Sequence, residues 1–281
     1  MLSHDRKNGL KRSLYHLVLW AISILFFSPV IWMIICSMKT KEQILTLPPK
    51  WLFVPTLKNY IGLFDRFNFS KELMNSIFMS LSAVVIAVVV SFLAAYSFSR
   101  FKPKGTDLIM FLLLSMRMVP AAAVVVPIYL LYAATGWKGT YLGMILFYAM
   151  FSIPFSVWIL KGFIDGVSER FDETALANGG SRMHIIFRLV MPQVKPGLIA
   201  AFIFNIIFVW NEFLFNYIIG GKKTATVPVG LAQGFTVGGG IQWDFIATIT
   251  TFYSVPLIIL IFFFQKYLLV GMTFGTVRGE V

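Results

Sequence analysis

Six stretches of the chain are almost free of charged side chains, and they constrain the fold more than any other feature. They cover residues 14–36, 74–99, 108–134, 141–163, 197–220 and 245–270. A helix of about 20 apolar residues can cross a bilayer, because all its backbone hydrogen bonds are made within the segment. The sequence therefore predicts an all-α membrane protein with six transmembrane helices.

The composition supports a membrane protein and argues against other classes. Of the 281 residues, 58% are hydrophobic and 13% are charged, and the mean hydropathy is +0.80. Soluble domains carry about 25% charged residues. The formal charge of +12 does not indicate a nucleic-acid partner, because the Lys and Arg residues lie mostly between apolar segments, where they orient spans and contact lipid head groups.

The few cysteine and histidine residues predict neither a disulfide nor a metal site. Cys36 is the one cysteine and lies inside an apolar segment. His4, His16 and His184 are far apart in the sequence. We therefore expect no metal and no cofactor bound by this chain.

Prolines inside the apolar segments predict bent helices. Pro120 and Pro127 lie in the third segment, Pro154 in the fourth and Pro256 in the sixth. Membrane helices tolerate such prolines when neighbouring groups satisfy the freed backbone carbonyls. The third segment is expected to be kinked.

The distribution of Lys and Arg predicts that both termini lie in the cytoplasm. With that orientation the inner segments hold fourteen Lys and Arg residues and the outer segments nine, as the positive-inside rule requires. The first apolar segment has no convincing cleavage site and is expected to remain as a span. We expect three regions: residues 1–73 with the first span and an outer loop, a core at 74–270 with a cytoplasmic loop at 165–196, and a cytoplasmic tail at 271–281. The other outer segment is 221–244.

The cytoplasmic loop contains the stretch "DETALANGGSRMHIIFRLVMP" at residues 172–192, which has the pattern of two short helices. Ser168 is a candidate N-cap for the first helix, and Gly179 and Gly180 are expected to end it. Ser181 is a candidate N-cap for the second helix, which Pro192 is expected to end. The sequence predicts a helix, a glycine turn and a second helix.

Two roles for this loop are compatible with its residues. Glu169 would lie in the positively polarised first turn, and Ala175 and Leu176 could pack on the second helix or offer a contact surface. One interpretation is a hairpin at the lipid surface that merely links two spans. The other is a docking element, because an acidic, capped helix suits a basic groove on a soluble partner.

A resemblance to a known family favours docking. The stretch resembles the EAA signature of permease subunits of binding-protein-dependent ABC importers, which reads Glu-Ala-Ala, three residues, Gly, then an apolar helix ending in Pro. The matching residues here are Glu173, Ala175, Gly179, Phe187 and Pro192. Three positions depart from the pattern, with Thr174 for the first alanine, Asn178 for the usual Asp and Gly180 for a usual Ala.

The resemblance extends over nearly the whole chain and is strongest to the carbohydrate-importer permeases of the maltose type. Similar pieces are "MVP" at 118–120, "WNEFLF" at 210–215 and "FQKYLLVGMTFGTVRG" at 264–279. The resemblance implies the type I ABC importer permease arrangement in the bacterial cytoplasmic (inner) membrane. It also implies that the C-terminal tail contacts the ATPase dimer interface.

The partners that the resemblance implies are a second homologous permease subunit, two ATP-binding subunits, an extracytoplasmic solute-binding protein and membrane lipid. The loop would be the coupling helix that receives the motion of the ATPase. Its implied coupling residues are Glu173, Thr174, Ala175, Leu176, Asn178, Gly179, Gly180, Phe187 and Pro192. The chain itself is not expected to be an enzyme, because "GGKKTAT" at 220–226 lacks the P-loop spacing. ATP and Mg would be bound by the partner ATPase.

Two charged residues lie deep inside predicted spans, where each costs several kcal/mol unless paired or wetted. They are Arg117 and Glu212. They either flank a translocation path or stabilise the bundle by pairing with each other or with a partner subunit. The same set of path or structural candidates includes Pro120, Asn205, Trp210, Asn211 and Asn216.

Two other classes of protein fit the sequence less well. A six-span secondary transporter or channel would show inverted repeats or an acidic relay, and no repeat is evident between residues 1–140 and 141–281. A membrane enzyme would need clustered catalytic groups, which the spans do not hold. An ABC importer permease for a non-carbohydrate solute remains an alternative. For a carbohydrate importer, a sugar, an oligosaccharide, a polyol or a glycerol phosphate are all compatible cargoes.

Overall fold

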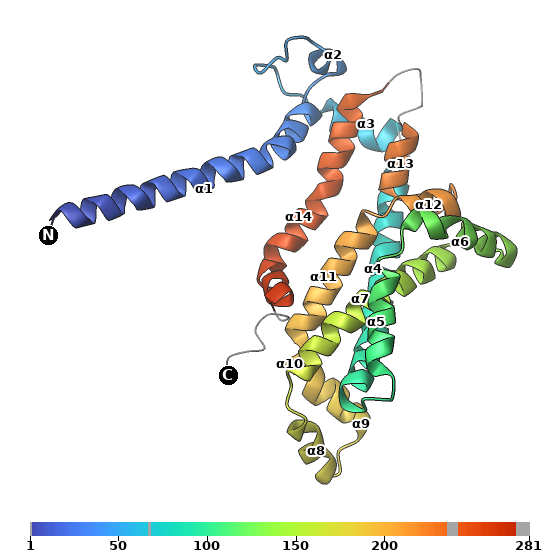
Figure 1. Cartoon of the computed structure of the whole chain (residues 1–281). Coiled ribbons are helices and arrows are strands. Elements are labelled where there is room, and N and C mark those ends of the chain that lie inside the picture. The colour runs from blue at the N-terminus through green and yellow to red at the C-terminus, as the bar shows by residue number, and fades with distance from the viewer. Residues whose placement is uncertain (1, 67–68, 235–240, 274–281) are drawn as a thin grey trace. The chain divides into compact units, whose positions relative to one another are not determined.

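The computed structural model describes residues 2–66, 69–234 and 241–273, and the regular structure within these ranges is helical (Figure 1). Four of the described helices are long and apolar enough to cross a membrane, and two bent helix pairs raise the number of candidate spans to six. The predicted fold class, an all-α membrane protein, is thus confirmed. The chain forms two compact units, Met1–Phe67 with Gln233–Ser254 and Asn68–Ala232 with Val255–Val281.

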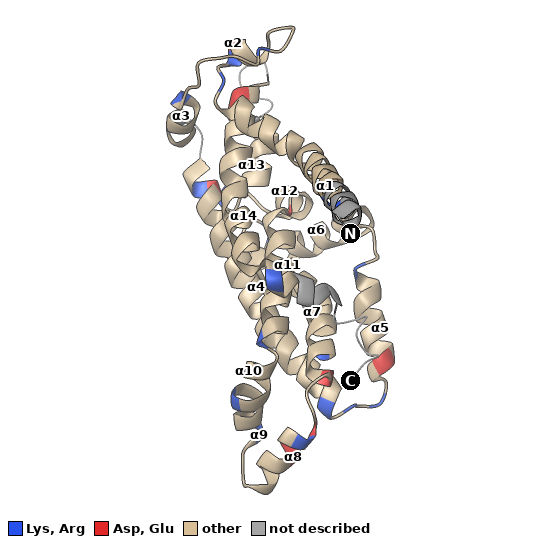
Figure 2. Cartoon of the chain, turned by 90° about the vertical axis from the view of Figure 1, so that its left-hand side faces the viewer, with Lys and Arg blue, Asp and Glu red and all other residues tan. Residues whose placement is uncertain are grey.

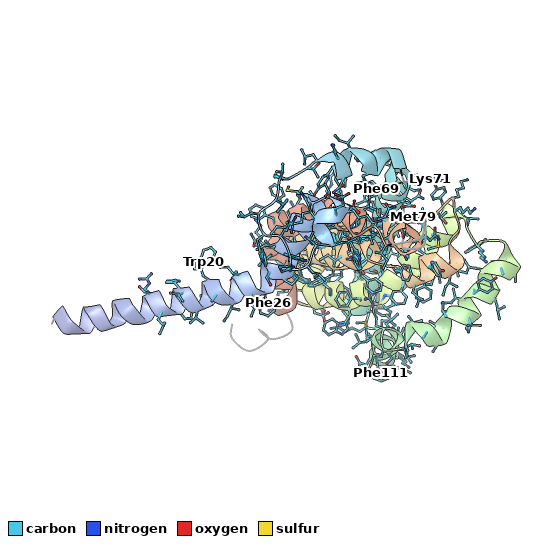
Figure 3. All side chains as sticks on the ribbon, turned by 90° about the horizontal axis from the view of Figure 1, so that it is seen from above. Trp20, Phe26, Phe69, Lys71, Met79 and Phe111 are labelled. Atoms are coloured by element: carbon cyan, nitrogen blue, oxygen red, sulfur yellow. The ribbon has the colours of Figure 1, made fainter. Side chains whose placement is uncertain are left out.

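The first unit contains α1 (Leu2–Ser37), α2 (Lys41–Ile44), α3 (Lys58–Arg66) and the beginning of α14 (Trp243–Thr273). The membrane-spanning part of α1 is apolar on all sides and exposed. Trp20 and Phe26, which are 70% and 77% exposed, project away from the helix (Figure 3). The buried Asn59 ties α3 to the end of α1, because its Nδ2 donates to the carbonyl oxygens of Ser37 (3.0 Å) and Lys39 (2.8 Å).

The second unit is built around α4 (Phe69–Arg100), α7 (Tyr141–Asp165) and α11 (Lys195–Trp210). Among the described helices, α4 and α7 share the most extensive contact. Small buried residues recur every fourth position along α4, at Ala83, Ala87, Ser91 and Ala95. Such a stripe lets two membrane helices approach closely. Ser91 Oγ also donates to the Ile153 carbonyl oxygen of α7 (3.2 Å).

The third apolar segment is broken at Pro120, which confirms and extends the predicted kink. The segment forms α5 (Thr106–Met116) and α6 (Ala121–Thr135), whose axes differ by 94°. Pro120 stands at the N-cap of α6, and Pro127 lies within that helix. Proline has no N–H to donate and clashes with the preceding turn, so the helix ends before it. Pro154 and Pro256 lie inside α7 and α14.

The fifth apolar segment differs from the expected continuous helix over residues 197–220. Helix α11 ends at Trp210, and a new helix, α12 (Leu214–Ile219), begins four residues later. The chain preceding α11 is also bent, by 77°. The reason for the break at residues 211–213 lies in the side chain of Glu212, described below.

Charged side chains of the second unit gather away from its long helices. Figure 2 shows Lys, Arg, Asp and Glu on α8 (Arg170–Ala177), whereas α4, α7 and α11 are nearly free of them along most of their length. Helix α13 (Val227–Gly234) follows α12 in the sequence. The tail predicted at 271–281 lies outside the described residues beyond Thr273, as do residues 235–240 of the 221–244 segment.

Candidate functional site

The loop between α7 and α11 begins with α8, whose start differs from the prediction. Helix α8 begins at Arg170, and Glu169 occupies its N-cap position without a capping side-chain bond. Ser168, the expected N-cap, accepts only a long hydrogen bond from the Arg170 backbone N–H (3.4 Å). The acidic residues of the first turn are Asp172 and Glu173. The positive N-terminal end of the helix dipole stabilises their negative charges.

A tight glycine turn ends α8, as predicted. The Gly179 N–H donates to the Leu176 carbonyl oxygen (2.9 Å), and the Gly180 N–H donates to that of Ala175 (2.8 Å). These are the two hydrogen bonds of a Schellman motif, which requires a left-handed residue after the helix. Gly179 fills that position with φ of +78°.

The same turn explains the glycine found where the resembled pattern has alanine. A Cβ atom on Gly180 would lie 2.7 Å from the Ala175 carbonyl oxygen, which is closer than van der Waals contact permits. The turn is therefore tight.

The second predicted helix forms, but its middle is a π-helix. Ser181 caps it as expected, accepting a hydrogen bond from the His184 N–H (3.3 Å). The run comprises α9 (Arg182–His184), a π-helix (Ile185–Val190) and α10 (Met191–Gln193). Pro192 lacks an N–H and clashes with the carbonyl four residues before it in an α-helix, and the wide π turn lies directly ahead of it. The run ends one residue after Pro192.

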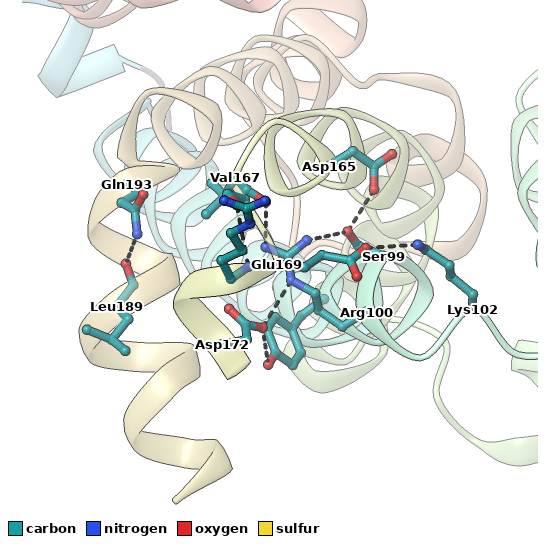
Figure 4. A network of polar contacts seen from close by, with 12 residues as sticks. Ser99, Arg100, Lys102, Asp165, Val167, Glu169, Asp172, Leu189 and Gln193 are labelled. Carbon is teal, nitrogen blue, oxygen red and sulfur yellow. Dashed lines mark hydrogen bonds and ion pairs between the residues drawn. The ribbon is translucent and has the colours of Figure 1, made fainter. Parts of the chain in front are cut away.

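A buried ion pair fixes α8 to the end of α4. The Asp172 carboxylate accepts hydrogen bonds from Arg100 Nε (3.0 Å) and the Tyr96 hydroxyl (2.8 Å) (Figure 4). The side chains of Arg100 and Asp172 are only 5% and 6% exposed. Arg100 Nη2 also donates to the Val167 carbonyl oxygen (2.9 Å). The end of α4 thereby holds both α8 and the segment that leads into it. We call Tyr96, Arg100 and Asp172 the clamp.

A second layer of polar contacts joins the ends of α4 and α7. Ser99 Oγ donates to Asp165 (2.7 Å), and Lys161 Nζ donates to the other oxygen of that carboxylate (2.8 Å). Lys102 forms an exposed ion pair with Glu169 (2.8 Å) (Figure 4). The hydrogen bond and charge of Lys102 lower the pKa of the Glu169 carboxyl. Such an exposed pair contributes little to stability, so the buried clamp is the stronger attachment.

Only some of the predicted coupling residues of α8 have exposed side chains. Glu173, Thr174 and Asn178 are exposed. Ala175 and Leu176 are half-buried and pack against the apolar core of the second unit, which includes Ile185 and Ile186. Their side chains thus support α8 from behind.

Three apolar side chains of α8 and of the helical run after it are exposed. Phe171, Met183 and Phe187 are 52%, 64% and 45% exposed. Of these, only Phe187 was among the predicted coupling residues.

The clamp residues were also missed by sequence reasoning. Arg100 is the last residue of α4 and lies 72 positions before Asp172. At the end of an apolar segment, an arginine indicates only a span boundary. The only available signal was a basic residue that ends one span and an acidic residue in the loop after a later span.

Arg117 is held by aromatic rings and an amide. Its guanidinium carbon lies 4.7 Å from the ring centre of Phe208 and 5.0 Å from that of Phe155, and Nη2 donates to Asn205 Oδ1 (3.4 Å). Asn205 is fully buried, and its Nδ2 donates to Ser156 Oγ (2.6 Å). Within the described residues Arg117 forms no ion pair with Glu212. Pro120, close to Arg117 in the sequence, is exposed.

Glu212 caps the restarted helix α12, which explains the break in the fifth span. Its Oε1 accepts from the Phe215 N–H (2.8 Å), and its Oε2 accepts from the Asn216 N–H (3.1 Å) and the Tyr148 hydroxyl (3.1 Å). The first amides of any helix lack partners within it. The Glu212 carboxylate accepts hydrogen bonds from two of these amides, so the charge predicted to lie deep in the span has a structural partner.

Replacing Glu212 with alanine is expected to destabilise the bundle by roughly 1–3 kcal/mol for each backbone N–H left unpaired. Glu212→Gln keeps one acceptor oxygen and should lose less. The thermal midpoint of the purified protein in detergent measures the effect. Equal midpoints for wild type and Glu212→Ala would contradict the capping role.

The remaining polar candidates of the fifth span are mostly committed to the fold. Asn216 is buried, donates to the Thr224 carbonyl oxygen (3.1 Å) and accepts from the Thr226 N–H (3.1 Å), which fixes the loop after α12. Asn211 is exposed and bonds to the Ile207 carbonyl oxygen (2.7 Å). Trp210 is 5% exposed.

Six candidate spans and one short, anchored, charged helix define an integral membrane protein of the multi-pass class. Residues 87–273 match the family described as "Binding-protein-dependent transport system inner membrane component". The chain belongs to this family. It is a transmembrane permease subunit of an ABC importer, which confirms the prediction from the sequence.

Similar proteins and structures agree with this assignment. The chain is 31% identical to the trehalose/maltose transport system permease protein MalG of Thermococcus litoralis over 98% of this chain and 100% of that protein. It is 30% identical to the probable ABC transporter permease protein y4oR of Sinorhizobium fredii over 99% of both chains. A bacterial ABC transporter structure involved in alginate import matches with a TM-score of 0.75 and 17% identity, over 94% of this chain and 97% of the other.

Proposed function

We propose that this permease forms, with a second homologous permease subunit, the translocation path for a carbohydrate-type solute. Two separate ATP-binding subunits, which bind ATP and Mg, would drive transport, and an extracytoplasmic binding protein would deliver the solute. The relatives' names support the cargo class, since they include permeases for trehalose/maltose, sulfoquinovosyl glycerol and diacetylchitobiose.

The observation that carries the coupling proposal is the anchoring of α8. The helix is closed by a Schellman turn at one end and fixed by the buried Asp172–Arg100 pair near the other. Its exposed side presents Glu173 and Thr174. A helix held this way moves with α4, so force applied by an ATPase subunit reaches a membrane span.

The proposed orientation places α8 and both termini in the cytoplasm. The excess of Lys and Arg in the inner segments supports it. Under this orientation the segment after α1 and the loop that precedes α13 face the binding protein.

Reconstitution tests this function. The chain, its partner permease, the ATPase and the binding protein, placed in proteoliposomes, should take up a labelled saccharide such as trehalose, maltose or diacetylchitobiose only with ATP. A complex that is stimulated only by an amino acid or a metal ion would instead support an importer for a non-carbohydrate solute.

Glu173→Ala is expected to reduce uptake about tenfold, which corresponds to roughly 1.4 kcal/mol of lost interfacial charge pairing. Membrane insertion should be unchanged, because Glu173 is exposed and its side chain makes no hydrogen bond or ion pair in the part of the chain that the structure describes. Thr174→Ala, next to it and also exposed, is the uncharged control. Uptake at the wild-type rate in Glu173→Ala would refute the ion-pair role.

A further inference from the structure

A narrow cavity of about 290 Å³ lies in the second unit, between α4, α11, α14 and the helical run that precedes α11. Every described side chain that lines it is apolar, and Phe92 and Phe187, whose ring centres are 6.5 Å apart, both contribute to its wall. A water molecule needs two to four polar partners in such a space. A sugar ring would leave its hydroxyl groups unpaired there. The cavity therefore suits an apolar chain and not the solute.

The volume of the cavity limits the shape of its occupant. One turn of an α-helix, about 10 Å wide and 5.4 Å long, fills roughly 420 Å³, which is more than the cavity holds. A helix of a partner subunit could therefore cover the opening but not fill the space. The lining residues Val89 and Phe264 belong to the spans Phe69–Arg100 and Trp243–Leu268, which lipid surrounds in a membrane. A lipid hydrocarbon chain is narrow enough to enter.

Lys195 places a positive charge beyond one end of this cavity. The lining residues of α11 are Leu198, Ile199, Phe202 and Ile203. Lys195 shares their helix face, because residues three, four, seven and eight positions apart on a helix lie on one side. Its Cα precedes that of Leu198 by about 4.5 Å and that of Ile203 by about 12 Å along the helix axis. Helical side chains lean toward the N-terminus, so the ammonium lies outside the apolar wall, at the end of the helix.

The Lys195 ammonium is accessible to an anion. Its side chain is exposed, and it makes no hydrogen bond or ion pair with any residue in 2–66, 69–234 or 241–273. Arg188, which directly follows Phe187 in the sequence, is also exposed and has no such partner in those ranges. Basic residues beside a groove between membrane helices attract the head groups of anionic lipids.

We propose that this cavity binds one acyl chain of an anionic phospholipid, whose phosphate pairs with Lys195. On the proposed orientation the lipid comes from the inner leaflet. A phosphatidylglycerol brings a net negative charge to the ammonium. A phosphatidylcholine has the same chains but also carries a positive choline, so it binds more weakly. Because Phe187 belongs to the run that joins α8 to α11, the bound chain also supports that run. The site does not depend on which solute is transported.

Photocrosslinking of the assembled complex in detergent tests the site. The probe is a phosphatidylglycerol with a diazirine on one acyl chain, and peptide mass spectrometry identifies the labelled residues. Adducts are expected on lining residues such as Phe202 and Phe264. Unlabelled dioleoyl phosphatidylglycerol should suppress this labelling at a concentration at least tenfold lower than dioleoyl phosphatidylcholine. If no lining residue is labelled, another chain covers the cavity and the proposal is wrong. Equal suppression by the two lipids would also overturn it.

Two lysine variants test the contact with the head group. Lys195→Gln should make the two unlabelled lipids equally effective competitors. Lys104→Gln removes the same charge from an exposed residue in the loop between α4 and α5 and should keep the tenfold difference. A difference that survives in Lys195→Gln would contradict the proposed pairing.

Two valine variants test the binding of the acyl chain without changing any charge. Val89→Phe places a larger side chain at the cavity and should lower the labelling of Phe202 and Phe264 at least tenfold. Val85→Phe is the matched control, because Val85 lies one helical turn earlier on α4, is 51% exposed like Val89, and is not among the lining residues. Labelling of Val89→Phe at the wild-type level would mean that the chain does not enter the cavity.

Discussion

Replacing Arg100 with methionine is expected to abolish solute uptake while ATP hydrolysis continues. The change leaves the Asp172 carboxylate buried beside the Tyr96 hydroxyl without its counter-charge, and removing one partner of a buried pair costs about 3–5 kcal/mol. It also removes the bond to the Val167 carbonyl. Helix α8 would then detach from α4, so ATPase closure would move α8 alone. Uptake per ATP hydrolysed in proteoliposomes measures the loss.

Variants of the same pair separate stability from transmission. Arg100→Met combined with Asp172→Leu removes both charges, and replacing a whole buried pair by apolar residues is often neutral for stability. The double variant is therefore expected to assemble like the wild type and to remain uncoupled. Lys102→Gln, which removes only the exposed pair with Glu169, is the control and should transport normally. If the stable double variant transports at the normal ratio, the clamp is only a folding element.

Gly179→Leu is expected to reduce uptake by more than tenfold without preventing membrane insertion. Gly179 has φ of +78°, a conformation that costs a non-glycine residue roughly 1–2 kcal/mol. No neighbouring atom lies within 4 Å of a Cβ at this position, so the effect arises from the backbone and not from a clash. The turn would open, and the angle between α8 and the second helix would change.

Gly162→Leu is the matched control for that experiment. Gly162 lies within α7, has no neighbouring atom within 4 Å of a Cβ, and has an ordinary helical backbone. The same change there should be close to neutral. Transport at normal rates in Gly179→Leu would mean that the turn does not set the position of α8.

The spans were predictable from the sequence because each one satisfies its own backbone and carries its own apolar pattern. The kink at Pro120 was also predictable, because proline lacks an N–H and clashes with the preceding helical turn. The break before α12 was not, because "WNEFLF" reads as continuous helix. The capping bonds from the Phe215 and Asn216 N–H groups to Glu212 are local, but the bond from the Tyr148 hydroxyl of α7 to the same carboxylate depends on packing that a single sequence does not report.

The glycine turn that ends α8 was predictable from the sequence, whereas the attachment near the start of α8 was not. Gly179, Gly180 and Ser181 act through bonds to residues within five positions of them, so a local pattern located them. The attachment through Arg100 depends on the packing of α4 beside α7, which a single sequence does not report. The sequence therefore located helix α8, but not the contacts that fix it to α4.

The most direct measurement of the central claim is site-specific photocrosslinking in the assembled complex. A photoreactive residue at Glu173 should yield an adduct with the ATPase subunit, and one at Leu52, which is 95% exposed in the segment after α1, should not. An ATPase adduct at Leu52, or none at Glu173 in a complex that transports, would contradict the account.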